Sequence, residues 1–181
     1  MVEMMKKYAE SGEFVALYTD FGNTTSFIYG RILAVDDTWV AILPVTQDGV
    51  SDGLLVKLCE DVFRMDVGGE YAEKMQRLMG SNPALEDYSI DAEKIVESVL
   101  QLAKTEHGIV SVEIEDSGID DITGFVRDSN DKTVTFDVVD SYGAPDGIAM
   151  IKASAISQIE YNGIAEKRVQ RLAAQNETML N

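Results

Sequence analysis

The chain contains one pattern of residues twice, and this repetition constrains its fold more than any other feature. Aligned with itself at an offset of 94 residues, the sequence shows coinciding glycines, aspartates and apolar residues over residues 30–78 without a gap. The coinciding residues are Gly30 and Gly124, Asp37 and Asp131, Val40 and Val134, Val45 and Val139, Gly49 and Gly143, Asp52-Gly53 and Asp146-Gly147, Gly69 and Gly163, and Gln76-Arg77-Leu78 and Gln170-Arg171-Leu172. Matches held at one offset indicate a tandem duplication of one small domain.

Each copy is predicted to be mainly β, with a helix, then five short antiparallel strands, then a second helix. In the first copy we expect helices over residues 1–11 and 71–79 and strands over 14–19, 28–35, 39–45, 54–58 and 62–66. In the second copy we expect helices from Ser89 or Asp91 to 105 and over 164–174, and strands over 109–114, 122–127, 134–139, 148–151 and 156–161. Five short strands with a glycine in the second close most economically into a small barrel, which removes the sheet edges.

The duplication also predicts where the domains begin and end. The first domain is expected over residues 1–80 and the second over 89–181, each with its flanking helices. The linker is residues 81–88, where Asn82-Pro83 and acidic residues interrupt the apolar periodicity.

Alternation along the strands predicts two hydrophobic cores. The residues expected to be buried are Ile32, Val40, Ile42, Val56 and Val62 in the first copy, and Val126, Val134, Phe136, Met150 and Ile156 in the second.

The charge is strongly acidic, with 15 Lys and Arg residues against 32 Asp and Glu residues and a net charge of −17. Proteins that bind nucleic acids usually present a basic face to the phosphates. The longest basic clusters here are the pairs Lys6-Lys7 and Lys167-Arg168. The charge therefore disfavours RNA or DNA as a partner.

The location predicted from sequence is the cytoplasm. No segment has the roughly 18 consecutive apolar residues of a membrane span, and Lys6-Lys7 follows the first apolar residues instead of preceding them as in a signal peptide. Cys59 is the only cysteine, so the chain has no internal disulfide, and we interpret it as a small core residue.

Several short segments resemble an Sm-like barrel, a type of SH3-like small barrel. They are Gly30-Arg31-Ile32 with Asp36 and Trp39-Val40, the spacing Val62-x-x-Met65, and Ile151-Lys152-Ala153 followed by Ile156 and Ile159. The resemblance implies two tandem five-stranded barrels, each preceded and followed by a helix. It also implies rings of barrels that join edge to edge, the fourth strand of one with the fifth of the next, and that bind RNA.

The residues with which Sm-like proteins contact RNA are mostly missing. The family's asparagine falls on Val40 and Val134, and its Arg-Gly pair falls on Leu58-Cys59 and Lys152-Ala153. Leucine cannot replace a bidentate guanidinium, and lysine replaces it poorly. By family position, the remaining candidates for RNA or partner contact are Trp39, Val40 and Lys152.

No other segment indicates catalysis, a cofactor or a metal. The acidic segments 113–116 and 120–121 lack the ligand spacing of an EF-hand, so we interpret them as a solvated hairpin loop. His107, the only histidine, follows a helix end, and no nucleophile–base arrangement is visible. Trp39 and Tyr142 are candidates for partly exposed anchors, although core packing is the expected role of Trp39.

The function predicted from these observations is a non-enzymatic cytoplasmic module for protein interaction or self-assembly, without a cofactor. The alternative is an RNA-binding Sm-type protein. Two barrels on one chain can satisfy one edge-to-edge junction internally and leave one edge open at each end. A small homo-oligomer is therefore slightly favoured over a monomer, with a six-barrel ring of three chains as one candidate.

Overall fold

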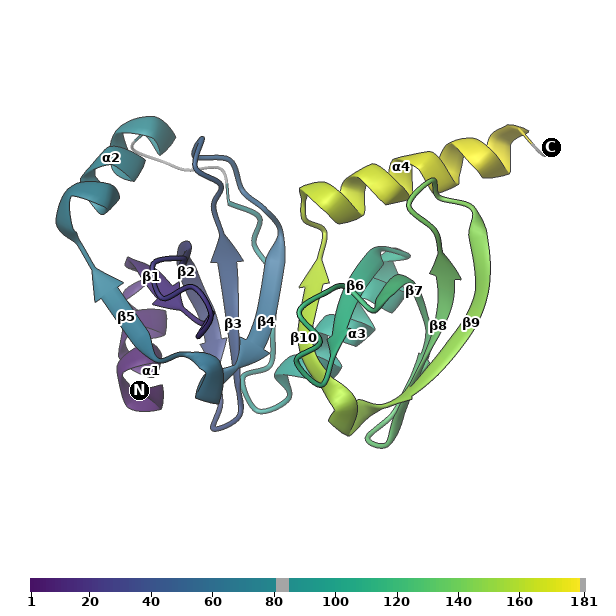
Figure 1. Ribbon diagram of the computed structural model, residues 1–181, viewed down its shortest axis with the longest axis horizontal. Helices are drawn as coiled ribbons and strands as arrows, with labels where there is room; N and C mark the ends of the chain where they lie inside the picture. The colour runs from purple at the N-terminus through teal and green to yellow at the C-terminus, as the bar shows by residue number, and fades with distance from the viewer. Residues whose placement is uncertain (81–84, 180–181) are drawn as a thin grey trace. The chain divides into compact units, whose positions relative to one another are not determined.

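The computed structural model describes residues 1–80 and 85–179 and divides the chain into two compact units, Met1–Ile95 and Val96–Asn181 (Figure 1). Both units are mainly β with flanking helices, which confirms the predicted class. Residues 81–84 of the predicted linker lie outside the described residues.

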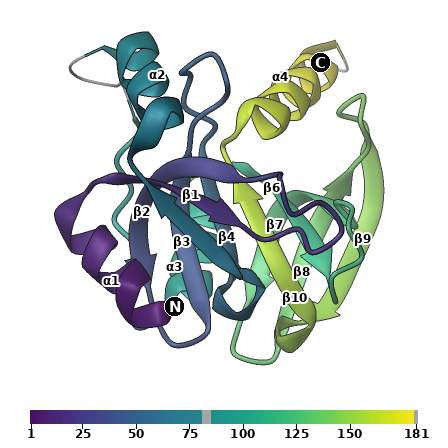
Figure 2. The same cartoon turned by 60° about the vertical axis from the view of Figure 1, so that its left-hand side comes forward.

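The first unit holds five antiparallel strands in the order β5-β1-β2-β3-β4. Its elements are α1 (Val2–Ser11), β1 (Phe14–Tyr18), β2 (Ile28–Val35), β3 (Trp39–Pro44), β4 (Leu54–Leu58), a 3-10 turn (Cys59–Asp61), β5 (Arg64–Val67) and α2 (Gly69–Met79). Helix α1 packs against β2 (Figure 2) and ends at Ser11, and the next residue, Gly12, has the left-handed backbone that suits a helix C-terminus.

The second unit repeats this order as β10-β6-β7-β8-β9. Its elements are α3 (Ile95–Glu106), β6 (Ile109–Ile114), β7 (Ile122–Ser129), β8 (Thr133–Val139), β9 (Pro145–Lys152), a 3-10 turn (Ala153–Ala155), β10 (Ile156–Tyr161) and α4 (Ile164–Met179). Helix α3 begins later than the predicted Ser89 or Asp91. Among the described residues, no helix is both long and apolar enough to cross a membrane.

The second strand of each unit is held by the same backbone contact. Gly30 lies opposite Pro44 in the ladder, and Gly124 lies opposite Val138. A Cβ atom on either glycine would lie 2.3 Å from a backbone carbonyl oxygen, that of Leu43 or that of Asp137. Each strand then shifts register two residues later, after Ile32 and after Val126, so the predicted glycine bends lie at equivalent positions.

The turn between the second and third strands is also equivalent in the two units. Asp36 Oδ1 accepts hydrogen bonds from the backbone N–H groups of Thr38 and Trp39 at 2.7 and 2.6 Å. Asn130 Oδ1 accepts the matching bonds from Lys132 and Thr133 at 2.9 and 3.0 Å. A short side chain with an acceptor oxygen therefore determines both turns.

The predicted closure of each sheet into a barrel is wrong. In the described residues, β5 pairs with β1 but not with β4, and β10 pairs with β6 but not with β9. The physical reason is the 3-10 turn after β4 and after β9. This turn does not form a hairpin between the fourth and fifth strands, and the fifth strand pairs with the first strand at the opposite edge of the sheet.

The closing helix of each unit packs against a glycine in the loop between the third and fourth strands. Gly143 has φ 76°, and a Cβ atom there would lie 2.3 Å from the backbone nitrogen of Ala173 in α4. Gly49 has φ 79° and lies against Leu78 and Met79 of α2. This packing gives the repeated glycine and the repeated leucine, Leu78 and Leu172, a structural role.

Alternation along β1 places its side chains in two apolar layers. Val15 and Leu17 join the core beneath α1, with Met5, Ile32, Val35, Val40, Ile42, Leu55, Cys59 and Val62. Ala16 and Tyr18 join a layer beneath α2, with Tyr29, Val45, Ala72 and Met75. Both faces of the sheet therefore carry a hydrophobic layer.

Nine of the ten predicted core residues are buried, and Met150 is the exception. Val56 is buried but lies outside the two core clusters, while Val126, Val134, Phe136 and Ile156 are buried in the second unit. Met150 is 70% exposed. Met150 lies on β9, the edge strand of the second unit's sheet, and its side chain is on the face of this strand that is exposed at Ile148 as well.

Truncation of the buried residues tests these assignments. Ile42→Ala and Phe136→Ala should each lower the free energy of unfolding by about 2–5 kcal/mol, because each leaves a cavity in a packed core. Met150→Ala is the matched control and should change it by less than about 0.5 kcal/mol. Urea unfolding measures all three, and equal costs for Met150 and Phe136 would contradict the strand phases.

The close approach at the glycines gives a second prediction. Gly30→Ala and Gly124→Ala should each destabilise the protein by about 1–3 kcal/mol or more, because the new methyl group meets backbone that cannot rotate away. Gly22→Ala is the control, since its Cβ would lie 3.2 Å from the Asp20 carboxylate, which can move. Thermal unfolding of the three variants compares them, and equal melting temperatures would exclude this role for the two glycines.

Candidate functional site

The outer edge of β9 is the most exposed apolar part of a regular element. Ile148 and Met150 alternate along this strand and are 60% and 70% exposed. In the ladder with β8 they lie opposite Asp137 and Thr135, and β9 is the last strand in the sheet order. An edge strand has backbone N–H and C=O groups available for another strand, so this edge can extend a sheet.

In the first unit, β5 is an edge strand of the sheet. Its last residue, Val67, is 39% exposed. Arg64 and Asp66 form an ion pair at 2.6 Å on the same strand, and the Tyr18 hydroxyl donates to Asp66 at 2.9 Å. This edge strand is short, and the charges of Arg64 and Asp66 on it are paired with each other.

The three contact candidates from sequence are not brought together within one unit. Trp39 is half-buried at the start of β3, and Val40 lies in the core beneath α1. Lys152 is exposed at the end of β9, opposite Thr133, which is the repeat equivalent of Trp39. Lys152 therefore belongs to the β9 edge, whereas Val40 has a structural position.

The other positions at which Sm-like proteins contact RNA are also largely buried. Val134 is a core residue of β8, and Leu58 is half-buried at the end of β4. Cys59 is buried, and loss of hydration raises the pKa of its thiol to about 11. A thiol with this pKa is almost fully protonated near neutral pH and reacts slowly, as expected for a core cysteine.

The acidic segment after β6 forms a loop ordered by its own side chains. Asp121 Oδ2 accepts hydrogen bonds from the Ile114 N–H at 2.8 Å and from the Ser117 hydroxyl, and these bonds lower the pKa of Asp121. Glu113 Oε1 accepts from the Gly118 N–H at 2.6 Å. Within residues 1–80 and 85–179, no three His, Cys, Asp or Glu side chains are placed to hold a metal ion.

His107 and Tyr142 have different surroundings. His107 adopts φ 52° after α3, its ring stacks on Phe125 with 4.4 Å between ring centroids, and its carbonyl accepts from Gln170 Nε2 at 3.1 Å. Tyr142 is exposed in the loop before β9, where its carbonyl accepts from Asn176 Nδ2 at 3.1 Å. Tyr142 thus has the accessibility of an anchor, while His107 packs locally.

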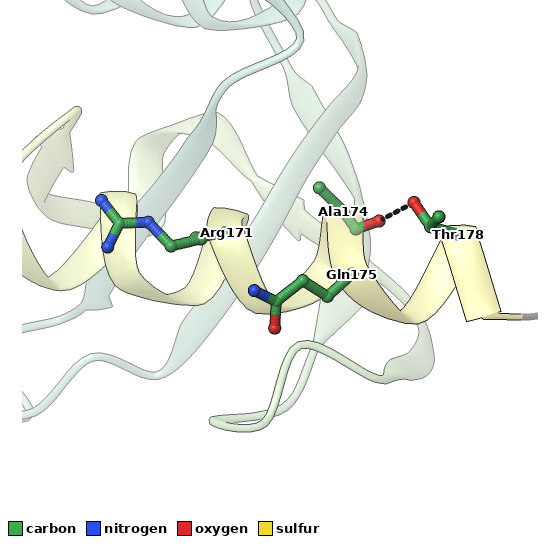
Figure 3. A pocket seen from close by; sticks show the side chains of 4 residues that line it. All are labelled: Arg171, Ala174, Gln175 and Thr178. Carbon is green, nitrogen blue, oxygen red and sulfur yellow. Dashed lines mark hydrogen bonds between the residues drawn. The ribbon is translucent and has the colours of Figure 1, made fainter.

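A shallow hollow runs along one side of α4. It is lined by Arg171, Ala174, Gln175 and Thr178, all from this one helix (Figure 3). The Thr178 hydroxyl donates to the Ala174 carbonyl at 2.9 Å, so its polar group is already used within the helix. The described residues that line the hollow do not converge from several elements, as the groups of a small-molecule site do.

Sequence reasoning expected one open edge at each end of the chain, but it missed the exposed apolar side chains of β9 because it assigned Met150 to the core. One signal was present: Asp146-Gly147 and Lys152 enclose a strand of only a few apolar residues, which is typical of an edge.

Comparisons with known proteins find no counterpart of this chain. No protein-family model matches it, and neither does any curated protein or any solved structure.

Proposed function

We propose that this protein is a non-enzymatic module that associates with other copies of itself through the exposed edge of β9. The observation that supports the proposal is the pair Ile148 and Met150, which are mostly exposed on an edge strand. Burial of two such side chains stabilises an interface by about 1.5–3 kcal/mol each, and backbone hydrogen bonds determine its register.

The partner edge in this proposal is β5 of another copy. In each unit the fifth strand pairs with the first, which leaves the fourth and fifth strands at the two edges of the sheet. β9 is the fourth strand of the second unit, and β5 is the fifth strand of the first unit. Pairing β9 with β5 joins two different surfaces, and repetition of such a contact closes into a ring or continues as a filament. The ring of three chains is one closed form.

The net charge opposes this association. Bringing together chains of −17 concentrates negative charge, and this repulsion weakens as salt screens it over a Debye length of about 10 Å at 0.1 M. Association through an apolar edge should therefore strengthen with salt, whereas association through ion pairs should weaken.

Light scattering after size-exclusion chromatography tests the proposal. The wild-type chain should have a mass that is a multiple of 19.9 kDa, with the larger species enriched at high salt. The double variant Ile148→Lys, Met150→Lys should elute as a monomer, because charge on an edge strand blocks strand pairing.

Ile119→Lys is the matched control, since Ile119 is 66% exposed in the same unit but lies in a loop. This variant should keep the wild-type mass. A wild-type mass of 19.9 kDa at both salt concentrations would exclude self-association.

RNA binding is the alternative function, and exposed Lys152 on β9 is the residue that favours it. A gel-shift assay with bulk cellular RNA separates the two functions. Salt-sensitive binding below about micromolar, lost in Lys152→Glu, would replace the self-association proposal.

A further inference from the structure

Helix α4 is docked on the second unit with an acidic residue inward and an apolar residue outward. Glu166, in the first turn of this helix, is 1% exposed, whereas Ile164 is 41% exposed. In α2 of the first unit, the residues at the repeat offset have the opposite arrangement, because Glu70 is exposed and Ala72 is buried. The polarity of the first turn is therefore inverted between the two closing helices.

The buried carboxylate of α4 contacts polar groups of the sheet. Glu166 Oε1 accepts a hydrogen bond from the Ser111 hydroxyl of β6 at 2.6 Å, and this hydroxyl lies 3.5 Å from that of Thr123 on β7. Glu166 Oε2 has no hydrogen-bond partner among the described residues. Removal of a carboxylate from water costs free energy that one hydrogen bond recovers only in part. This contact therefore stabilises the docked helix less than an apolar contact of the same size would.

Further along the helix, α4 buries a smaller apolar side chain than α2 does. Met75 of α2 is completely buried, while its equivalent in α4, Val169, is half-buried. The next residue of α4, Gln170, uses its Nε2 to donate to the His107 carbonyl at 3.1 Å. A hydrogen bond of this kind is exchanged for one with water when a helix detaches, so it opposes detachment less than apolar burial does.

Helix α4 also holds the loop that leads into β9. Figure 1 shows the helix beside the loop between β8 and β9. A Cβ atom at Gly143 of this loop would lie 2.3 Å from the backbone nitrogen of Ala173. In addition, Asn176 Nδ2 donates to the Tyr142 carbonyl at 3.1 Å. Strand β9 begins at Pro145, directly after these contacts, so the position of α4 affects the start of the β9 edge.

We propose that α4 is a reversibly docked helix: it detaches together with the loop before β9 while the sheet of the second unit stays folded, and the docked state is the one that associates through β9. The detachment is a local opening, which occurs where few apolar contacts hold an element. The effect on association rests on the proposed function. It follows because a strand that is already ordered loses less conformational entropy when it pairs.

Hydrogen exchange of the full chain in dilute solution at constant pH, followed by mass spectrometry, tests the opening. After correction for intrinsic exchange rates, amides of α4 over residues 168–176 should be less protected than those of β6, β7 and β8 by about tenfold or more. Amides of the loop over residues 140–144 should open with the helix. The strands should keep the protection that belongs to unfolding of the whole unit.

One double variant should stabilise the docked helix. Ser111→Ala with Glu166→Met replaces both polar partners by apolar side chains, and the flexible methionine fills the space of the glutamate. The resulting contact resembles the apolar layer beneath α2. Protection of α4 and of the loop over 140–144 should rise together by about tenfold or more, because no buried polar atom of the pair remains.

A single variant should have the opposite effect. Gln170→Ala removes the bond to the His107 carbonyl and should lower the protection of α4 by about two- to tenfold. Gln175→Ala is the matched control, because it makes the same change at an exposed position of the same helix. This control should leave the protection of α4 unchanged.

Light scattering at equal protein and salt concentrations tests the effect on association. The double variant should increase the fraction of the larger species, and Gln170→Ala should decrease it. If the wild-type chain associates and neither variant changes this fraction, control of β9 by α4 is overturned. A monomeric wild-type chain would instead exclude the proposed function and this control with it, and hydrogen exchange would then decide the opening of α4 alone.

Equal protection of α4 and of β6, β7 and β8 would overturn the proposal, because the helix would then open only when the whole unit unfolds. A loop over 140–144 that keeps its protection when the variants change that of α4 would also overturn it. If the double variant fails to fold, the comparison of Gln170→Ala with Gln175→Ala decides.

Discussion

The fold of each unit depends on the contact between a glycine and a carbonyl group of the neighbouring strand. At Gly30 and Gly124 the space for a side chain is taken by the carbonyl oxygens of Leu43 and Asp137, both at 2.3 Å from an added Cβ. The register shift two residues later adds local bending and twist to the same strand. The bent strand therefore adds curvature to the five-stranded sheet of each unit.

On this shared backbone the two units carry different side-chain layers. Beneath α2 the first unit has a row of contacting aromatic rings from Phe14 through Tyr29, Tyr71, Phe27, Tyr18 and Phe63 to the exposed Phe21. Beneath α4 the second unit has Ser111, Thr123 and Glu166. The layer in the first unit is apolar, whereas the contact in the second unit is polar and includes a buried carboxylate. The repeated residues therefore specify the backbone, and the residues that differ distinguish the two units.

The sequence predicted the order of the elements because the backbone constraints are local. Gly30, the turn at Asp36 and the short turn at residues 59–61 each impose a conformation that neighbouring residues reveal. The sequence did not predict the exposure of Met150, because alternation gives the face of a side chain and not what covers that face. Val134 and Met150 both fit the pattern, yet only Val134 is buried. The buried Glu166 was missed for a related reason: a glutamate in the first turn of a helix usually faces water.

Two departures from a stable design lie in the second unit, the buried Glu166 and the exposed apolar side chains of β9. Alanine in place of Glu166 would remove an unpaired buried oxygen, as Ala72 shows in the first unit. Polar residues in place of Ile148 and Met150 would reduce the apolar surface that the β9 edge exposes to water. Each feature lowers the stability or solubility of the isolated chain, and each is simple to replace without a change of backbone. The helix contact and the strand edge are therefore the parts of the second unit whose side chains the shared backbone does not require.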